Sequence, residues 1–173
     1  MRWICKFFVL MMVAAPAFGA DPCTALPEAA RLYLIANPGW AVITSADLAA
    51  SDRTLWTRQH GHDCPGFALA DLDGSGRPFA ALGLISRRLD EVSERIVLVR
   101  QALGGLEVRV LIPDERASNP VVLFRLPPGK AREWESDREL VIAHDSVGVA
   151  WLQAASRQYY WTNGAFVCVQ TAD

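Results

Sequence analysis

Short apolar segments bounded by turn residues fill the chain from Gly66 onward, and they restrict the fold more than any other feature. Runs of five to eight residues lie at 67–72, 79–86, 94–100, 106–112, 120–125, 140–144, 149–154, 158–162 and 165–170. Segments of this length, separated by turn signals, are typical of an antiparallel β-meander. Between two of them, the LPPGK sequence at 126–130 is expected to form a rigid loop.

Helical signals precede this β-rich part. Apolar residues recur at helical spacing between Leu26 and Tyr33, and Asn37-Pro38-Gly39 ends the pattern. The WAVI sequence that follows is expected to form a short strand, and residues 45–59 one or two short helices. The chain therefore predicts an α+β fold in which N-terminal helices pack on a mainly antiparallel β-meander sheet of roughly six to nine strands.

The first 19 residues have the features of a secretory signal peptide. Arg2 and Lys6 precede the apolar run from Phe7 to Ala15, which is too short to span a bilayer. Small residues after Pro16 predict cleavage behind Gly19 or Ala20; the alternative is an uncleaved membrane anchor. We expect residues 20–173 to form a single α+β domain that is periplasmic or secreted, with no transmembrane segment in the mature chain.

Three cysteines follow the leader: Cys23, Cys64 and Cys168. An oxidising compartment favours one disulfide. Cys23 and Cys64 lie in turn-like sequences and Cys168 in a strand-like one, so we favour a Cys23–Cys64 bridge. Other pairings, or three free thiols, remain alternatives.

The C-terminal sequence YYWTNGAFVC predicts a β-hairpin. Asn163-Gly164 suits a two-residue type I′ turn, which sets Trp161 opposite Phe166 and Tyr159 opposite Cys168. These four side chains then share one face, either as core or as an aromatic binding surface. Trp134, in a charged segment, is a second candidate for a binding surface beside Tyr159 and Trp161.

The sequence DLDGSGR, residues 71–77, spaces oxygen-bearing groups at alternate positions. Asp71, Asp73, Ser75 and the carbonyl of Arg77 suit the oxygen coordination that calcium requires. The twelfth position is Leu82 instead of glutamate, and strand-like sequences flank the loop, so it is not an EF-hand. The alternative is a hairpin turn built from the same residue types.

This loop resembles the Asp-rich strand–loop–strand units of FG-GAP and VCBS-type proteins. The whole chain also resembles small secreted bacterial proteins of unknown function that carry one such unit, through CTALP at 23–27, AHDSVGV at 143–149 and YYWTNGAF at 159–166. The resemblance implies calcium ligands at Asp71, Asp73 and Ser75. Ser75 and Phe79 stand where that pattern has aspartates, so we expect no cofactor, or weak calcium in the roughly millimolar range.

Two histidine-containing sequences offer further chemistry. His60 and His62, on alternate residues, form a candidate zinc or copper pair whose alternative is a solvated loop. His144-Asp145-Ser146 contains the residue types of a hydrolase triad, but neighbours in a strand point to opposite faces. We expect a polar turn there, and no catalytic residue is assigned.

Charge limits the class of partner. Removal of Arg2 and Lys6 lowers the basic residues from 17 to 15 against 19 acidic ones, leaving a net charge of −4. Phosphate binding needs clustered basic residues, so nucleic acid is not expected as a partner. We expect an exported non-enzymatic binding protein, such as a periplasmic inhibitor or immunity-type protein that acts on another exported protein. The alternatives are a calcium-stabilised structural module and an enzyme of unknown class.

Overall fold

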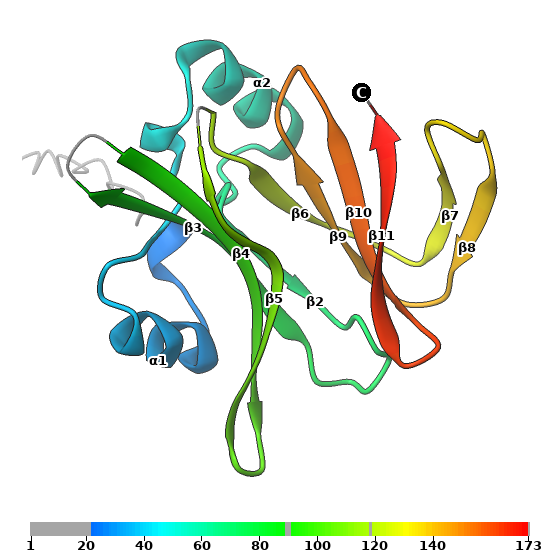
Figure 1. The fold of residues 1–173 in the computed structure, drawn as a ribbon, viewed down its shortest axis with the longest axis horizontal. Coiled ribbons are helices and arrows are strands. Elements are labelled where there is room, and N and C mark those ends of the chain that lie inside the picture. Colours follow the sequence, from blue (N-terminus) through cyan, green and yellow to red (C-terminus); the bar gives the residue numbers. More distant parts are fainter. Residues whose placement is uncertain (1–21, 89–90, 118, 173) are drawn as a thin grey trace, which may run out of the picture.

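The computed structural model describes residues 22–88, 91–117 and 119–172. The predicted leader and its cleavage site lie outside these residues. The described chain is mainly antiparallel β-sheet with two short α-helices (Figure 1). No helix in this part of the chain is long and apolar enough to cross a membrane.

The helices lie before the β-rich part of the chain. In order, the elements are η1 (Pro22–Thr24), α1 (Glu28–Ala36), β1 (Ala41–Val42), η2 (Ser45–Asp47) and α2 (Ala50–His60). Asn37 ends α1, where its backbone N–H and side-chain amide donate to the carbonyls of Leu34 and Tyr33. Gly61 ends α2 with a φ of 64°, which favours glycine.

Ten further strands follow α2. They are β2 (Phe67–Ala70), β3 (Phe79–Arg88), β4 (Glu91–Ala102), β5 (Gly105–Arg116), β6 (Val122–Leu126), β7 (Gly129–Arg132), β8 (Glu139–Ile142), β9 (Ser146–Ala150), β10 (Ser156–Thr162) and β11 (Ala165–Ala172). All nine predicted runs overlap a strand, although β9 begins three residues earlier than its run. Strand β7 was not predicted, because it includes part of the 126–130 segment that was expected to be a loop.

The strands form three sheets instead of the single sheet expected. A five-stranded sheet has the order β1-β3-β4-β5, with β2 also paired to β3. A four-stranded sheet has the order β11-β10-β9-β6, and β7 pairs with β8. Figure 1 shows the β7–β8 hairpin on the opposite side of the molecule from α1. Every pairing is antiparallel.

Strand β3 has apolar residues on both faces, so a single sheet with one face in solvent could not bury it. Its residues from Phe79 to Ser86 are all buried, on both faces of the strand. One face contributes Leu82 and Leu84 to a cluster that also contains Ala30 and Tyr33 of α1. The other contributes to a larger cluster with the four-stranded sheet. A continuous apolar run therefore marked a strand covered on both sides.

The larger cluster joins the two main sheets. It contains residues of β2, β3 and β4 together with residues of β6, β9 and β10. Trp56 of α2 is 1% exposed and belongs to the same cluster. This contact fixes α2 at one end of the space between the sheets, where the largest pocket lies.

Two predictions about local structure are confirmed. Cys23 and Cys64 form a disulfide with a Cα–Cα distance of 4.9 Å, whereas Cys168 carries a free, exposed thiol on β11. The C-terminal hairpin also has the expected register, with Tyr159 opposite Cys168 and Trp161 opposite Phe166.

Candidate functional site

The loop between β2 and β3 directs its polar side chains back onto its own backbone. The Asp71 Oδ2 atom accepts from the N–H of Gly76 at 2.9 Å, and Asp73 Oδ1 accepts from that of Ser75 at 3.2 Å. Ser75 Oγ accepts from the N–H of Arg77 at 3.3 Å. These bonds close a tight turn of the kind that Asp, Ser and Gly favour.

Arg100 of β4 lies against the same oxygens. Its Nη1 atom donates to Asp73 Oδ2 at 2.7 Å, to Ser75 Oγ at 3.3 Å and to the Arg77 carbonyl at 3.4 Å. Three of the four predicted calcium ligands therefore contact a cation that belongs to the protein. Burial alone would raise the pKa of Asp73, but hydrogen bonds from Ser75 and Arg100 outweigh it, so this pKa lies below its usual value.

A second ion pair holds the start of this loop. Asp145 accepts two hydrogen bonds from Arg125, at 2.8 and 2.9 Å, and a third from the backbone N–H of Asp71 at 3.0 Å. The bonds from Arg125 are the main reason that the pKa of Asp145 lies below its usual value. The other oxygen of Asp71, Oδ1, is buried and has no hydrogen-bond partner among the described residues.

The HDS sequence and the Asp-rich loop, distant in sequence, are in contact. A Cβ atom at Gly74 would lie 2.4 Å from Cε1 of the His144 imidazole, so a larger residue at this position would have to displace that ring. Ser146 is fully buried, and its hydroxyl accepts from Gln158 at 2.7 Å. The cavity beside these residues, about 280 Å³, is lined by Asp71, Arg125, Pro128, Ala143, His144 and Asp145. His144 and Asp145 therefore have a structural role. The His144 ring packs against the loop at Gly74, and Asp145 accepts a hydrogen bond from the loop backbone.

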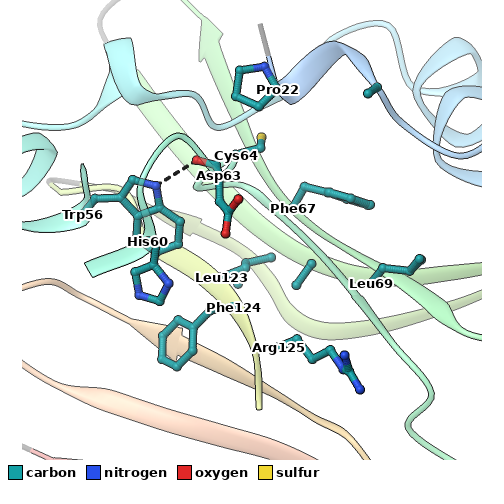
Figure 2. Close-up of a pocket in the computed structure, with 12 residues that line it drawn as sticks. Pro22, Trp56, His60, Asp63, Cys64, Phe67, Leu69, Leu123, Phe124 and Arg125 are labelled. Carbon is teal, nitrogen blue, oxygen red and sulfur yellow. Dashed lines mark hydrogen bonds between the residues drawn. The ribbon is translucent and has the colours of Figure 1, made fainter. Parts of the chain in front are cut away.

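The largest pocket lies at the other end of β2, between α2, β2 and β6 (Figure 2). It encloses about 430 Å³. Its lining residues are Pro22, Ala25, Trp56, His60, Asp63, Cys64, Phe67, Ala68, Leu69, Leu123, Phe124 and Arg125. Carbon atoms form most of this surface, and Leu69 at its edge is 45% exposed.

An aromatic stack forms one wall of this pocket. The His60 ring lies 4.0 Å from the Trp56 indole and 5.2 Å from the Phe124 ring, measured between centroids. Burial lowers the pKa of His60, and the negative charge of Asp63 opposes this shift without cancelling it. At neutral pH His60 is therefore an uncharged part of the wall.

Two charged side chains of opposite sign line the pocket, and they differ in their partners. Arg125 is held by Asp145 in a two-bond ion pair. Asp63 is exposed, and its carboxylate makes no hydrogen bond or ion pair with any residue that the structure describes, although its backbone carbonyl accepts from the Trp56 indole at 2.9 Å. Figure 2 shows this carboxylate between the Trp56 and Phe67 side chains. Of the two charged side chains that line the pocket, the one without an ion-pair partner among the described residues is therefore the negatively charged Asp63.

The two histidines of the candidate metal pair lie in different environments. His60 lies in the aromatic stack, whereas His62 lines a cavity beside η2. Within residues 22–88, 91–117 and 119–172, no group of three or more His, Cys, Asp or Glu side chains gathers around a metal-sized space.

The three aromatic residues considered for a binding surface lie in different environments. Trp134, between β7 and β8, is 55% exposed. Trp161 is half-buried and meets Phe166 edge to face at 4.7 Å. Tyr159 is 7% exposed and belongs to the core, so its ring is not part of the surface.

Sequence reasoning separated His60 from Trp56 because it ended the second helix one residue too early. Trp56 and His60 are four residues apart, which places them on one face of α2 only if the helix includes His60. Placing His60 in a loop paired it with His62 instead. The glycine at position 61 was the available signal for the helix end.

Comparisons with protein-family profiles, with curated proteins and with solved structures find no match. The resemblance of the Asp71–Arg77 loop to FG-GAP units therefore stays a prediction.

Proposed function

We propose that this protein is an exported, non-enzymatic binding protein whose pocket between α2, β2 and β6 receives a basic residue of a partner protein. The observation that carries the proposal is the uncommitted Asp63 carboxylate beside a pocket with mainly apolar walls. Lysine and arginine combine an apolar stem with a cationic end, so both parts find a matching surface. Trp56 is 1% exposed and stacked on His60, so within the aromatic wall it is the half-buried Phe124 ring that can add attraction for a cation through its π face.

The hydrogen bonds and ion pairs made by the other polar groups support a binding role over catalysis. Asp145 and Asp73 are engaged by arginines, and Ser146 accepts from Gln158. Glu94, 2% exposed, has a pKa raised by burial, but it accepts hydrogen bonds from the backbone of Val121 and the indole of Trp151. Groups held in this way position the chain instead of attacking a substrate.

The disulfide and the leader-like N-terminus support export to the periplasm or outside the cell. A periplasmic inhibitor or immunity-type protein is one form that such a binding protein takes. A calcium-stabilised module is less well supported, because Arg100 occupies the oxygens that the loop would offer to the ion.

A titration with defined peptides tests the proposal. Short acetylated peptides that differ only in one residue, arginine or its uncharged isostere citrulline, are added while the Trp56 indole N–H is followed by NMR. We expect the arginine peptide to shift this signal and to bind about tenfold more tightly than the citrulline peptide, a difference of about 1.4 kcal/mol. Equal affinity, or no shift with either peptide, rejects the proposal.

Matched variants locate the effect. Asp63→Asn should remove the preference for arginine, whereas Glu135→Gln, the same charge change on an exposed residue between β7 and β8, should retain it. A photoreactive side chain in place of Leu69 should then cross-link a partner in the exporting organism. That product should disappear with Asp63→Asn and should not form from Val141, which is 78% exposed on β8.

A further inference from the structure

The segment from Asp71 to Phe79 departs from the calcium-loop pattern at two positions, Ser75 and Phe79, and Arg100 contacts both of them. Ser75 stands in place of an aspartate, and its hydroxyl accepts from Arg100 at 3.3 Å. Phe79 stands in place of another, and its ring lies 4.0 Å below the Arg100 guanidinium. A hydroxyl and an aromatic face suit a guanidinium, whereas calcium binds oxygen atoms and gains nothing from an aromatic ring.

The guanidinium lies among the oxygens that the loop would offer to an ion. Its single Nη1 atom meets three loop oxygens, from Asp73, Ser75 and the Arg77 carbonyl. The Arg100 side chain is 11% exposed, so it is built into the fold and does not sample solvent freely. Its Nε atom donates to Glu107 at 2.8 Å, which places a second carboxylate beside the same charge.

We propose that Arg100 is the permanent cation of this loop, and that it makes calcium unnecessary by occupying the calcium position. The residues therefore do not fit calcium while Arg100 is present. Removing the guanidinium leaves the carboxylates of Asp73 and Glu107 and two neutral oxygens facing one space. Two negative charges and oxygen ligands are what a divalent calcium ion requires, so the variant should acquire a calcium site.

Thermal unfolding in excess chelator and in 5 mM calcium chloride tests this, with calorimetric titration of calcium as the second readout. The natural sequence should show a shift of less than about 2 °C. Arg100→Ala should unfold several degrees lower in chelator and recover by at least about 5 °C in calcium, with a Kd of about 1 mM or below. Adding Asp73→Asn to Arg100→Ala should abolish the recovery.

Arg100→Gln is a second variant that retains a polar side chain if Arg100→Ala is too unstable to purify. Arg109→Ala is the matched control, because Arg109 contacts Glu107 at 3.3 Å but makes no hydrogen bond or ion pair with the described residues of the loop. It should show no calcium response. A large calcium shift in the natural protein overturns the proposal. So does the absence of a calcium response in both Arg100 variants, including their failure to fold with calcium present.

Discussion

Acidic side chains near the two ends of strand β2 differ in whether they have an ion-pair partner. At its C-terminal end, Asp73 is matched by Arg100, and Asp145 is matched by Arg125 while it holds the backbone of Asp71. At its N-terminal end, the Asp63 carboxylate has no such partner among the described residues and borders the largest pocket. The strand between them is only four residues long.

This difference separates charge that shapes the fold from charge that remains available. The Asp73–Arg100 pair is largely buried, so removing one partner leaves the other unsatisfied. In the second pair only Asp145 is buried, and Arg125 is 57% exposed, but the Asp145 carboxylate still holds the backbone of the loop. A carboxylate at an open pocket stays hydrated and contributes little to folding, so it is free to meet a ligand. Changes at the loop end should therefore affect stability, and changes at Asp63 should affect binding.

The largest expected effect concerns the disulfide at the pocket end. Cys23 and Cys64 are 41 residues apart, and replacing both with serine should lower the free energy of unfolding by about 4 kcal/mol in the chain-entropy model. Chemical denaturation measures this loss. Cys168→Ser is the comparator and should change stability by less than about 0.5 kcal/mol, because that thiol is exposed. A loss below about 1 kcal/mol for the double variant would show that the bridge hardly restrains the unfolded chain.

Two glycines of the loop give a matched test of how tightly that end is packed. Gly74 and Gly76 have φ angles of 69° and 73°, so alanine is strained at both. Gly74→Ala must also displace the His144 ring, whereas a Cβ at Gly76 meets open space. We expect losses of about 2–3 kcal/mol for Gly74→Ala and about 1 kcal/mol for Gly76→Ala. Similar losses at both positions would mean that His144 does not support the loop.

The Asp145 ion pair should appear as an acid-sensitive part of the stability. Hydrogen bonds from Arg125 hold the folded-state pKa of Asp145 below its ordinary value near 3.8. Its contribution is therefore complete at neutral pH and is lost as the pH falls below about 4, through the depressed folded pKa. Asp145→Asn should lose less stability than Gly74→Ala at pH 7 and should unfold with a shallower dependence on acid.

The pH dependence is measured as the difference between the natural protein and Asp145→Asn in chemical denaturation from pH 7 to pH 2. Taking the difference removes the contributions of Asp73, whose pKa is also lowered, and of Glu94, whose pKa is raised. If the two curves of unfolding free energy against pH run parallel over that range, the Asp145 ion pair makes no acid-sensitive contribution to stability and the prediction is wrong.

Local signals predicted most of the secondary structure. The end of α1 at Asn37, the α2 helix and the Asn163-Gly164 hairpin were readable because each depends on a few adjacent residues. The disulfide was also predicted from the contexts of its cysteines. The division into three sheets was not predicted, because which strands share a sheet depends on contacts between distant segments. The buried run of β3 carried the clue, since a strand covered on one face would alternate.

The candidate sites show the same limit. The Asp71–Arg77 turn was visible as a motif, but its cation comes from Arg100, 23 residues beyond Arg77, and no local pattern links the two. His144 was considered as a member of a triad, whereas its contact with Gly74 exists only in the folded chain. The pocket combines segments from Pro22 to Arg125, so it could be found only after the sheets were placed.

The smallest effect on stability is expected at Asp63, where the comparison is sharpest. Asp63→Asn removes the charge of an exposed side chain that has no ion-pair partner among the described residues, so the free energy of unfolding should change by less than about 0.5 kcal/mol. The pKa of His60 should nevertheless fall further below its usual value, because the Asp63 charge favours the protonated imidazole and burial disfavours it. NMR titration of the His60 ring measures this shift, and Glu135→Gln should leave it unchanged. A stable variant with a lower His60 pKa and no preference for the arginine peptide would assign Asp63 to recognition. A loss of stability comparable to that of Gly74→Ala would instead make both ends of β2 structural.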